Sequence, residues 1–195
     1  MNELTLPRTV EVSGRQVELR LMARGDAAAI LAFAATIAPH DLLFLNRDIR
    51  NPKVVAAWED QIAQGLITSV LALHDGRVCG CTAVVRDPFS WSAHVSEIRV
   101  VTGEEMRGSG LGRLLAQECL ILAAAAGASK VFVRATVDQV AALAVFQDLG
   151  FVPEALLREH VCDPQGQAHD IAILSLDLGR QQARHKNYGF ENVGE

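Results

Sequence analysis

The hydrophobic and polar residues of the first third of the chain follow periods that predict a strand hairpin and then two helices. Residues 10–22 alternate with a period of two around a Ser-Gly-Arg turn, which predicts two antiparallel strands. Asp26 stands where it can cap a helix whose apolar residues recur at helical spacing. Pro39 and Pro52 then bracket a loop-like stretch, and a second helix is expected over residues 54–64.

From residue 67 onward the pattern changes to strands that alternate with helices. Two apolar runs, 67–73 and 78–85, are joined by Asp75-Gly76, a strong signal for a hairpin turn. Thr136 and Gln139 have the spacing of a capping box at the start of a helix. In chain order, the remaining pattern predicts a strand near 94–101, a helix over 110–126, a strand over 131–135, a helix ending at 149, and a closing pair of strands over 151–162 and 171–178. This order is typical of one mixed α/β domain.

Composition and charge narrow the class of protein. Half of the 195 residues are hydrophobic and 21% are charged, which is the balance of a soluble globular domain. The net charge of -5 argues against a nucleic-acid binder, which usually needs a basic face. No apolar run reaches the length of a membrane span, and the first residues lack the pattern of a secretion signal. We therefore expect a cytoplasmic protein that binds neither nucleic acid nor a membrane.

The four cysteines do not form a metal-binding pattern. Cys79-Gly80-Cys81 resembles a metal or redox pair, but no second cysteine pair or histidine cluster completes a zinc site. The pair also lies inside a predicted strand, where free cysteine behaves as a small hydrophobe. We expect buried thiols and no metal.

The residues that carry chemistry form a glycine-rich run, Arg107-Gly108-Ser109-Gly110-Leu111-Gly112-Arg113, between a predicted strand and a predicted helix. Glycines let backbone N–H groups approach an anion, and the start of a helix adds a positive dipole end. The arginine at each end of the run could contact a phosphate oxygen. The run therefore predicts a phosphate-binding loop.

Two nucleotide-binding motifs are excluded by the residues of this loop. A Walker loop needs a lysine before Ser or Thr, and the loop has none. In a dinucleotide-binding loop the third glycine would stand at Arg113, and the loop would follow an early strand. A glycine-rich turn that binds nothing stays possible, but the flanking arginines would then be coincidental.

The arrangement Arg-x-x-Gly-x-Gly is matched by Arg107, Gly110 and Gly112. Here the sequence resembles the GNAT superfamily of N-acetyltransferases, whose signature is Arg/Gln-x-x-Gly-x-Gly/Ala after the central strand. A later predicted helix that ends in Gly150-Phe151 resembles the second cofactor motif of that family. The segment between residue 101 and Arg107 is longer than is common there and lacks the usual proline.

The resemblance implies a fold and a cosubstrate. The fold would be a single domain over residues 1–178, a mixed and mostly antiparallel twisted sheet flanked by helices, followed by a polar tail over 179–195. The cosubstrate would be acetyl-coenzyme A (acetyl-CoA). The residues implied to bind it are Val100, Val101 and Thr102 beside the pantetheine arm, Arg107, Gly108, Ser109, Gly110, Leu111, Gly112 and Arg113 around the phosphates, and Gln139 and Phe146.

The implied reaction is attack of a neutral amine on the thioester carbonyl. Glu97, an acidic residue of the central strand, is the candidate base; alternatively it is a solvated residue or pairs with Arg99 or Arg20. Phe146 stands where the family usually has a tyrosine that protonates the leaving thiolate. A thiol with a pKa of roughly 8.5 can leave without an acid, so this departure weakens the family mechanism without excluding it.

The leading hypothesis is an N-acetyltransferase that acts on a primary amine of a small molecule or peptide. The resemblance also implies a homodimer. The alternative is a CoA-binding sensor without catalysis, and a weaker one is another acyl donor such as a succinyl group. The run 42–45 is expected either in the acceptor wall or in the core. Three residues near the closing hairpin are expected to lie on the surface or to stabilise that hairpin rather than to act in catalysis: His160, His169 and Asp170.

Overall fold

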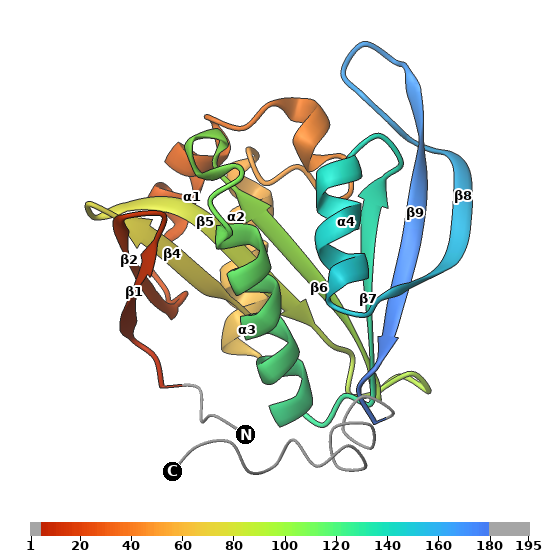
Figure 1. Ribbon diagram of the computed structural model, residues 1–195, viewed down its shortest axis with the longest axis horizontal. Helices are drawn as coiled ribbons and strands as arrows, with labels where there is room; N and C mark the ends of the chain where they lie inside the picture. The colour runs from red at the N-terminus through yellow and green to blue at the C-terminus, as the bar shows by residue number, and fades with distance from the viewer. Residues whose placement is uncertain (1–4, 180–195) are drawn as a thin grey trace.

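In the computed structural model, which describes residues 5–179, nine strands form one open sheet with helices on both of its faces (Figure 1). The strands are β1 (Arg8–Val12), β2 (Arg15–Leu21), β3 (Ile67–Thr68), β4 (Val70–His74), β5 (Arg77–Val85), β6 (Val95–Thr102), β7 (Lys130–Thr136), β8 (Val152–Cys162) and β9 (Ala168–Asp177). The helices are α1 (Ala27–Ala34), α2 (Pro52–Ala63), α3 (Leu111–Ala125) and α4 (Val140–Asp148), with the 3-10 turns η1 (Pro39–Leu42) and η2 (Glu104–Met106).

The strand order is β1-β2-β4-β5-β6-β7-β9-β8, with β3 beside β5. All of these pairings are antiparallel except the one between β6 and β7, which is parallel. Figure 1 shows α3 and α4 in front of the sheet, while α1 and α2 pack on its other face around a separate apolar cluster. The predicted mixed, mostly antiparallel sheet flanked by helices is confirmed. The predicted tail, 179–195, lies outside the described residues except for its first residue.

The predicted hairpins form, because their turn residues adopt the backbone that a tight turn needs. In the first hairpin Val10 faces Val17 across the pair, as the alternation indicates. Asp75 and Gly76 have φ values of 50° and 73°, the positive pair that a two-residue hairpin turn requires. The run 67–73 is interrupted, since Ser69 leaves the sheet and its hydroxyl accepts a hydrogen bond from the buried Trp58 indole at 2.9 Å.

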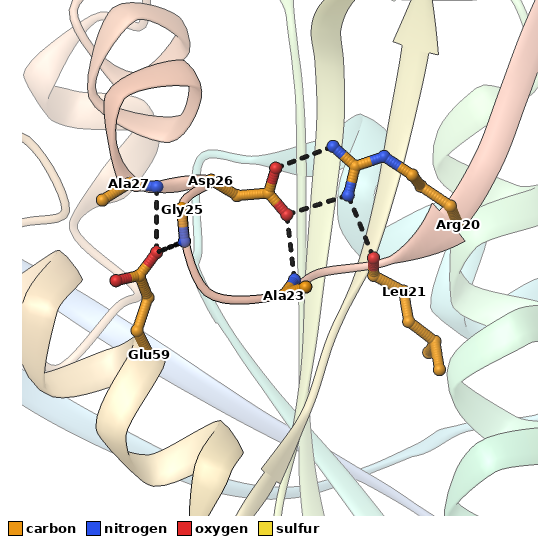
Figure 2. A network of polar contacts seen from close by, with 7 residues as sticks. All are labelled: Arg20, Leu21, Ala23, Gly25, Asp26, Ala27 and Glu59. Atoms are coloured by element: carbon orange, nitrogen blue, oxygen red, sulfur yellow. Dashed lines mark hydrogen bonds and ion pairs between the residues drawn. The ribbon is translucent and has the colours of Figure 1, made fainter.

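Asp26 is the N-cap residue of α1, as predicted, but its side chain does not cap the helix. Its carboxylate accepts hydrogen bonds from the Arg20 guanidinium at 2.7 and 2.8 Å (Figure 2). Glu59 of α2 caps the helix instead, because its Oε1 accepts from the N–H groups of Gly25 and Ala27, both at 3.0 Å. A charged partner on β2 binds the aspartate more strongly than a backbone amide would.

The predicted capping box of α4 is also wrong. Thr136 is still paired in β7, opposite Ile171 of β9, so it cannot begin a helix. Gln139 is the N-cap residue, and its side chain makes no capping hydrogen bond. The helix itself ends as expected, with Gly150 at a φ of 94°.

The Cys-Gly-Cys sequence is explained by packing. A Cβ on Gly80 would lie 2.9 Å from Leu115 Cδ1, so glycine is needed for α3 to approach β5. Cys79 and Cys81 are buried on either side of it, and burial raises the pKa of the Cys81 thiol to about 12. The expectation of small buried thiols is confirmed for this pair.

Candidate functional site

The glycine loop connects the central strand β6 with α3, as the sequence predicted. After β6, the N–H of Gly103 donates to the Cys79 carbonyl at 2.8 Å, and η2 then forms one short turn. This turn takes up the additional residues that separate the strand from Arg107. Helix α3 begins at Leu111, and Gly110 is its N-cap residue.

The backbone of the loop is arranged to bind an anion. Gly108 and Gly110 have φ values of 71° and 91°, which favour glycine. Among residues 5–179, no group accepts a hydrogen bond from either of their N–H groups. The first turn of α3 adds further backbone amides and the positive end of a helix of 15 residues. These donors fit a phosphate or pyrophosphate.

The turn of the N-terminal hairpin supports the loop from outside. Arg15 donates to the Glu105 carbonyl at 2.9 Å, and the Ser13 hydroxyl donates to the Ser109 carbonyl at 3.1 Å. The Ser109 hydroxyl also donates to the Met106 carbonyl at 2.7 Å. Sequence reasoning missed this support, because its two sides lie 90 or more residues apart in the chain and share no local pattern.

The two arginines of the loop contact carboxylates in this structure. Arg107 forms an ion pair with Asp41 of η1, and Arg113 forms one with Asp148 of α4 at 3.3 Å. Both guanidinium groups are exposed, so each ion pair is weak and can exchange for another anion. Their role as phosphate ligands stays a prediction.

The central strands separate beside this loop. The parallel ladder of β6 and β7 begins at Val95 and ends where Glu97 faces Phe132. Beyond that point β6 pairs only with β5, so its edge toward β7 is open over residues 98–102. The predicted residues Val100, Val101 and Thr102 lie in this segment. Because Gly103 donates to Cys79 of β5, the alternation of the strand turns the backbone groups of Val101 toward β5 and those of Val100 and Thr102 toward the open edge, where they are available to a ligand.

A cavity of about 230 Å³ lies on the α1–α2 face of the sheet, behind this split. Its apolar lining includes Val101, Trp58 and Leu45. Leu42 of the run 42–45 is buried in the core, as one of the two expectations has it, whereas Leu45 lines the cavity. A role of the run in the acceptor wall stays a prediction. The guanidinium-bearing residues Arg99 and Arg47 also line the cavity.

Glu97 is buried at the base of the split, with a fractional exposure of 7%. Its Oε2 accepts a hydrogen bond from Arg99 at 2.6 Å, and its Oε1 lies 3.5 Å from Nε of Arg134. The expected contact with Arg99 is therefore present, whereas Arg20 pairs with Asp26 instead. Arg134 was not foreseen, because the contact depends on the parallel register of two strands.

Gln139 and Phe146 take different positions around α4. The Gln139 amide donates to the Asp41 carbonyl at 3.5 Å, and the carboxylate of the same Asp41 pairs with Arg107. Phe146 is buried and packs edge-to-face on Phe151, with ring centroids 5.3 Å apart. The structure therefore gives Phe146 a core contact; its contact with a cofactor stays a prediction.

The loops at this end of the sheet bring together a histidine cluster that spacing did not reveal. His40 of η1 lies 2.8 Å from Asp138, and its ring centroid is 4.9 Å from that of His169. His169 also contacts Asp163 of its own hairpin at 3.1 Å, the hairpin role expected for it. The Thr136 hydroxyl and then His40 lower the pKa of the Asp138 carboxyl. His40, Asp138 and His169 each offer an atom within 4.8 Å of the others.

The sequence matches a known protein family over the segment that contains this site. The model of the acetyltransferase (GNAT) family matches residues 37–151, which contain the split, the glycine loop and α4. The chain belongs to the GNAT acetyltransferase family. No curated protein matches the sequence.

Solved GNAT structures have the same fold. An acetyltransferase of this family from Streptococcus pneumoniae is 21% identical, with a TM-score of 0.71 over 83% of this chain and 99% of that one. The protein yncA from Salmonella typhimurium, solved with its cofactor acetyl-CoA, is 19% identical, with a TM-score of 0.68 over 83% and 94%. A ribosomal-protein-alanine N-acetyltransferase from Brucella melitensis is 22% identical, with a TM-score of 0.69 over 82% and 99%.

The protein is thus an acetyl-CoA-dependent acetyltransferase of the GNAT family. The free N–H groups of Gly108 and Gly110 and the open edge of β6 fit this cosubstrate. No helix among residues 5–179 is long and apolar enough to cross a membrane. The cytoplasmic location and the homodimer remain predictions.

Proposed function

We propose that this GNAT enzyme transfers the acetyl group to a primary amine by direct attack of the amine on the thioester. One observation carries the proposal: the open edge of β6 adjoins the glycine loop at its end and the 230 Å³ cavity on its α1–α2 face. Val101 joins the two, since its side chain lines the cavity and its chain neighbours Val100 and Thr102 turn their backbone groups toward the open edge. An acyl donor and an acceptor can therefore meet at the split.

The residues of the loop and of β6 would hold acetyl-CoA, which supplies the thioester. The backbone amides of the loop, with Arg107 and Arg113, would bind its phosphates, and Val100, Val101 and Thr102 would bind the pantetheine arm. Binding would exchange the ion pairs with Asp41 and Asp148 for pairs with phosphate. Gln139 and Phe146 would adjoin the cofactor from α4.

The chain's own groups define the chemistry. A backbone N–H on the open edge of β6 would stabilise the oxyanion that forms as the amine attacks. Phe146 has no proton to give, so the thiol leaves as the thiolate, consistent with its pKa of roughly 8.5. Two roles are open to Glu97: it accepts the proton of the amine through water, or it holds Arg99 and Arg134 in place.

The second candidate is a sensor that binds acetyl-CoA without transferring the acetyl group, and Phe146 in place of tyrosine favours it. Free thiol released from acetyl-CoA should be measured with a panel of amines and without amine. Amine-dependent release supports the transferase. Binding of acetyl-CoA with no release for any amine would support the sensor.

A pair of glycine variants tests the proposed cofactor loop. Gly110→Ala and Gly127→Ala place the same strain at φ values of 91° and 85°, at opposite ends of α3, and neither new Cβ meets an atom within 4 Å. Both should lower the melting temperature by similar amounts. We expect only Gly110→Ala to weaken binding of acetyl-CoA, by about tenfold or more, as measured by calorimetry. Equal affinities in the two variants would contradict the assignment of the loop.

A further inference from the structure

Two arginines flank the point where the central strands separate. The parallel register ends at Glu97 and Phe132, and two more residues on each strand would place Arg99 opposite Arg134. Like charges directly opposite each other on a sheet destabilise it. Here both guanidinium groups lie on Glu97, which is the carboxylate they share, so the three side chains together carry one excess positive charge.

The hydrogen-bonding capacity of these arginines is not used up. The buried Nε atoms of Arg99 and Arg134 have no hydrogen-bond acceptor among residues 5–179. A buried donor without an acceptor is costly, and in a site it marks a position for an acceptor from a ligand. Arg134 contacts Asn46 through another nitrogen, whereas Arg99 lines the cavity.

The cavity itself is positively charged. Arg99 and Arg47 line it, and no Asp or Glu of the described chain does. Arg47 forms no ion pair within residues 5–179, whereas Asp48 beside it is paired with Arg50 at 2.7 Å. This local excess of positive charge lies within a protein whose net charge is -5. It is therefore a property of the cavity and not of the whole surface.

We propose that the acceptor is an amino acid with an apolar side chain, whose carboxylate is bound by Arg99 with help from Arg47. This inference rests on the proposed transferase function and deepens it. A planar guanidinium binds a carboxylate through two hydrogen bonds, which fixes the orientation of the amine. The apolar residues Ile49, Val54 and Trp58 line the rest of the cavity and accommodate the side chain.

Size and charge argue against drug-sized amines and polyamines as acceptors. Arg99 and Val101 lie on the same face of β6, about 7 Å apart along the strand, so the carboxylate and the reacting amine must be close together. The volume of about 230 Å³ is below the roughly 300–1,000 Å³ of pockets for drug-sized ligands. A polyamine would place a second ammonium group near Arg99 and Arg47, where it is repelled.

The decisive measurement compares three amines that differ only at the acid group. Leucine, leucinamide and 3-methylbutylamine should be compared as acceptors by kcat/KM for thiol release, with other apolar amino acids alongside. We expect at least a tenfold preference for an apolar amino acid over its amide. Equal or faster acetylation of the amide and the simple amine would overturn the inference and leave the transferase function standing.

Variants of the arginine assign the preference to this site. Arg99→Gln should reduce the ratio of kcat/KM for the acid over the amide at least tenfold, and Arg99→Lys, which keeps the charge and can keep the contact with Glu97, should reduce it less. Arg50→Gln is the matched control, because Arg50 lies on a second cavity and is paired with Asp48. It should leave the ratio unchanged. The same reduction in all three variants would overturn the assignment.

Binding separates failure of this inference from failure of the transferase function. Calorimetry with CoA and the amino acid present measures the complex without turnover. Amino-acid binding that Arg99→Gln weakens at least tenfold, with no thiol release, would sustain the carboxylate site and reject the transferase. If neither binding nor acetylation of any amino acid is found while other amines react, the carboxylate site is rejected.

Discussion

At the scale of single residues, Glu97, Arg99 and Arg134 form a charged group at the point where the central strands separate. Glu97 is buried at the base of the split, and both of its oxygens lie near guanidinium groups. Its candidacy as a base came from sequence position alone. The contacts that give it a second role come from two strands that are adjacent in space and separated by α3 in the chain.

Glu97→Gln distinguishes the two roles while keeping the shape of the side chain. If Glu97 is the base, kcat should fall by about 10²-fold or more near neutral pH, with KM of the acceptor little changed. The fall in kcat should be smaller at a pH above the pKa of the acceptor amine, because the amine is then already neutral and needs no base. A steady-state pH profile measures both effects. If kcat/KM instead falls at every pH because the KM of the acceptor rises, Glu97 positions Arg99 and Arg134.

At the scale of elements, the junction of β2 with α1 shows how tertiary contacts replace a local cap. Arg20 takes the Asp26 carboxylate, and Glu59 of α2 then supplies the acceptor for the amides at the start of α1 (Figure 2). The hydrogen bond from Arg20, and then that from the Ala23 amide, lower the pKa of Asp26. The junction holds α1 against α2, and α2 forms a wall of the cavity.

Asp26→Asn should cost about 1.5–3 kcal/mol of unfolding free energy at pH 7, the range for hydrogen bonds to charged groups. The folded pKa of Asp26 is lower than its unfolded value, so its stabilisation is present above the unfolded pKa, about 3.9, and is lost as the pH falls through the folded value. The difference between wild type and variant should therefore narrow below about pH 4. Urea unfolding at pH 7 and at decreasing pH measures this.

The control for this prediction is Asp60→Asn. Asp60 pairs with Arg24 at 3.4 Å, but the two side chains are 64% and 74% exposed. An exposed pair contributes less than about 1 kcal/mol, so this variant should change stability little at any pH. Equal effects of the two variants would show that the Arg20–Asp26 pair is no stronger than a surface pair.

At the scale of the whole molecule, an ion pair joins strand β1 to helix α3. Arg8 of β1 pairs with Glu118 of α3, whose side chain is 2% exposed and surrounded by the core. The residues are 110 positions apart in the chain. Together with the contacts from Ser13 and Arg15, this pair attaches the N-terminal hairpin to the elements that form the glycine loop.

Arg8→Met should cost about 3–5 kcal/mol of unfolding free energy, because it leaves Glu118 buried without its partner. Combining it with Glu118→Leu should recover most of that loss, since no charge then remains to be desolvated. Urea unfolding of wild type and of both variants measures this. A double variant no more stable than Arg8→Met would show that the loss comes from packing of the arginine stem and not from the charge.

The sequence by itself determined the elements whose signals are local. Asp75-Gly76 forms its hairpin because both residues adopt a positive φ. The loop after β6 forms because Gly108 and Gly110 adopt positive φ values, which favour glycine. These signals depend on a few adjacent residues, so they survive without knowledge of the fold. They sufficed to predict the sheet, the loop and the family.

Only the tertiary structure decided which side chains meet. Glu59 caps α1, Thr136 stays in its strand, and Arg99 meets Arg134 on Glu97, and each depends on elements that are distant in the chain. Hydrogen bonds and ion pairs act over a few ångströms, so their partners are fixed by register and packing rather than by spacing along the chain. For the same reason the charge of the cavity could be recognised only after the sheet had been assembled.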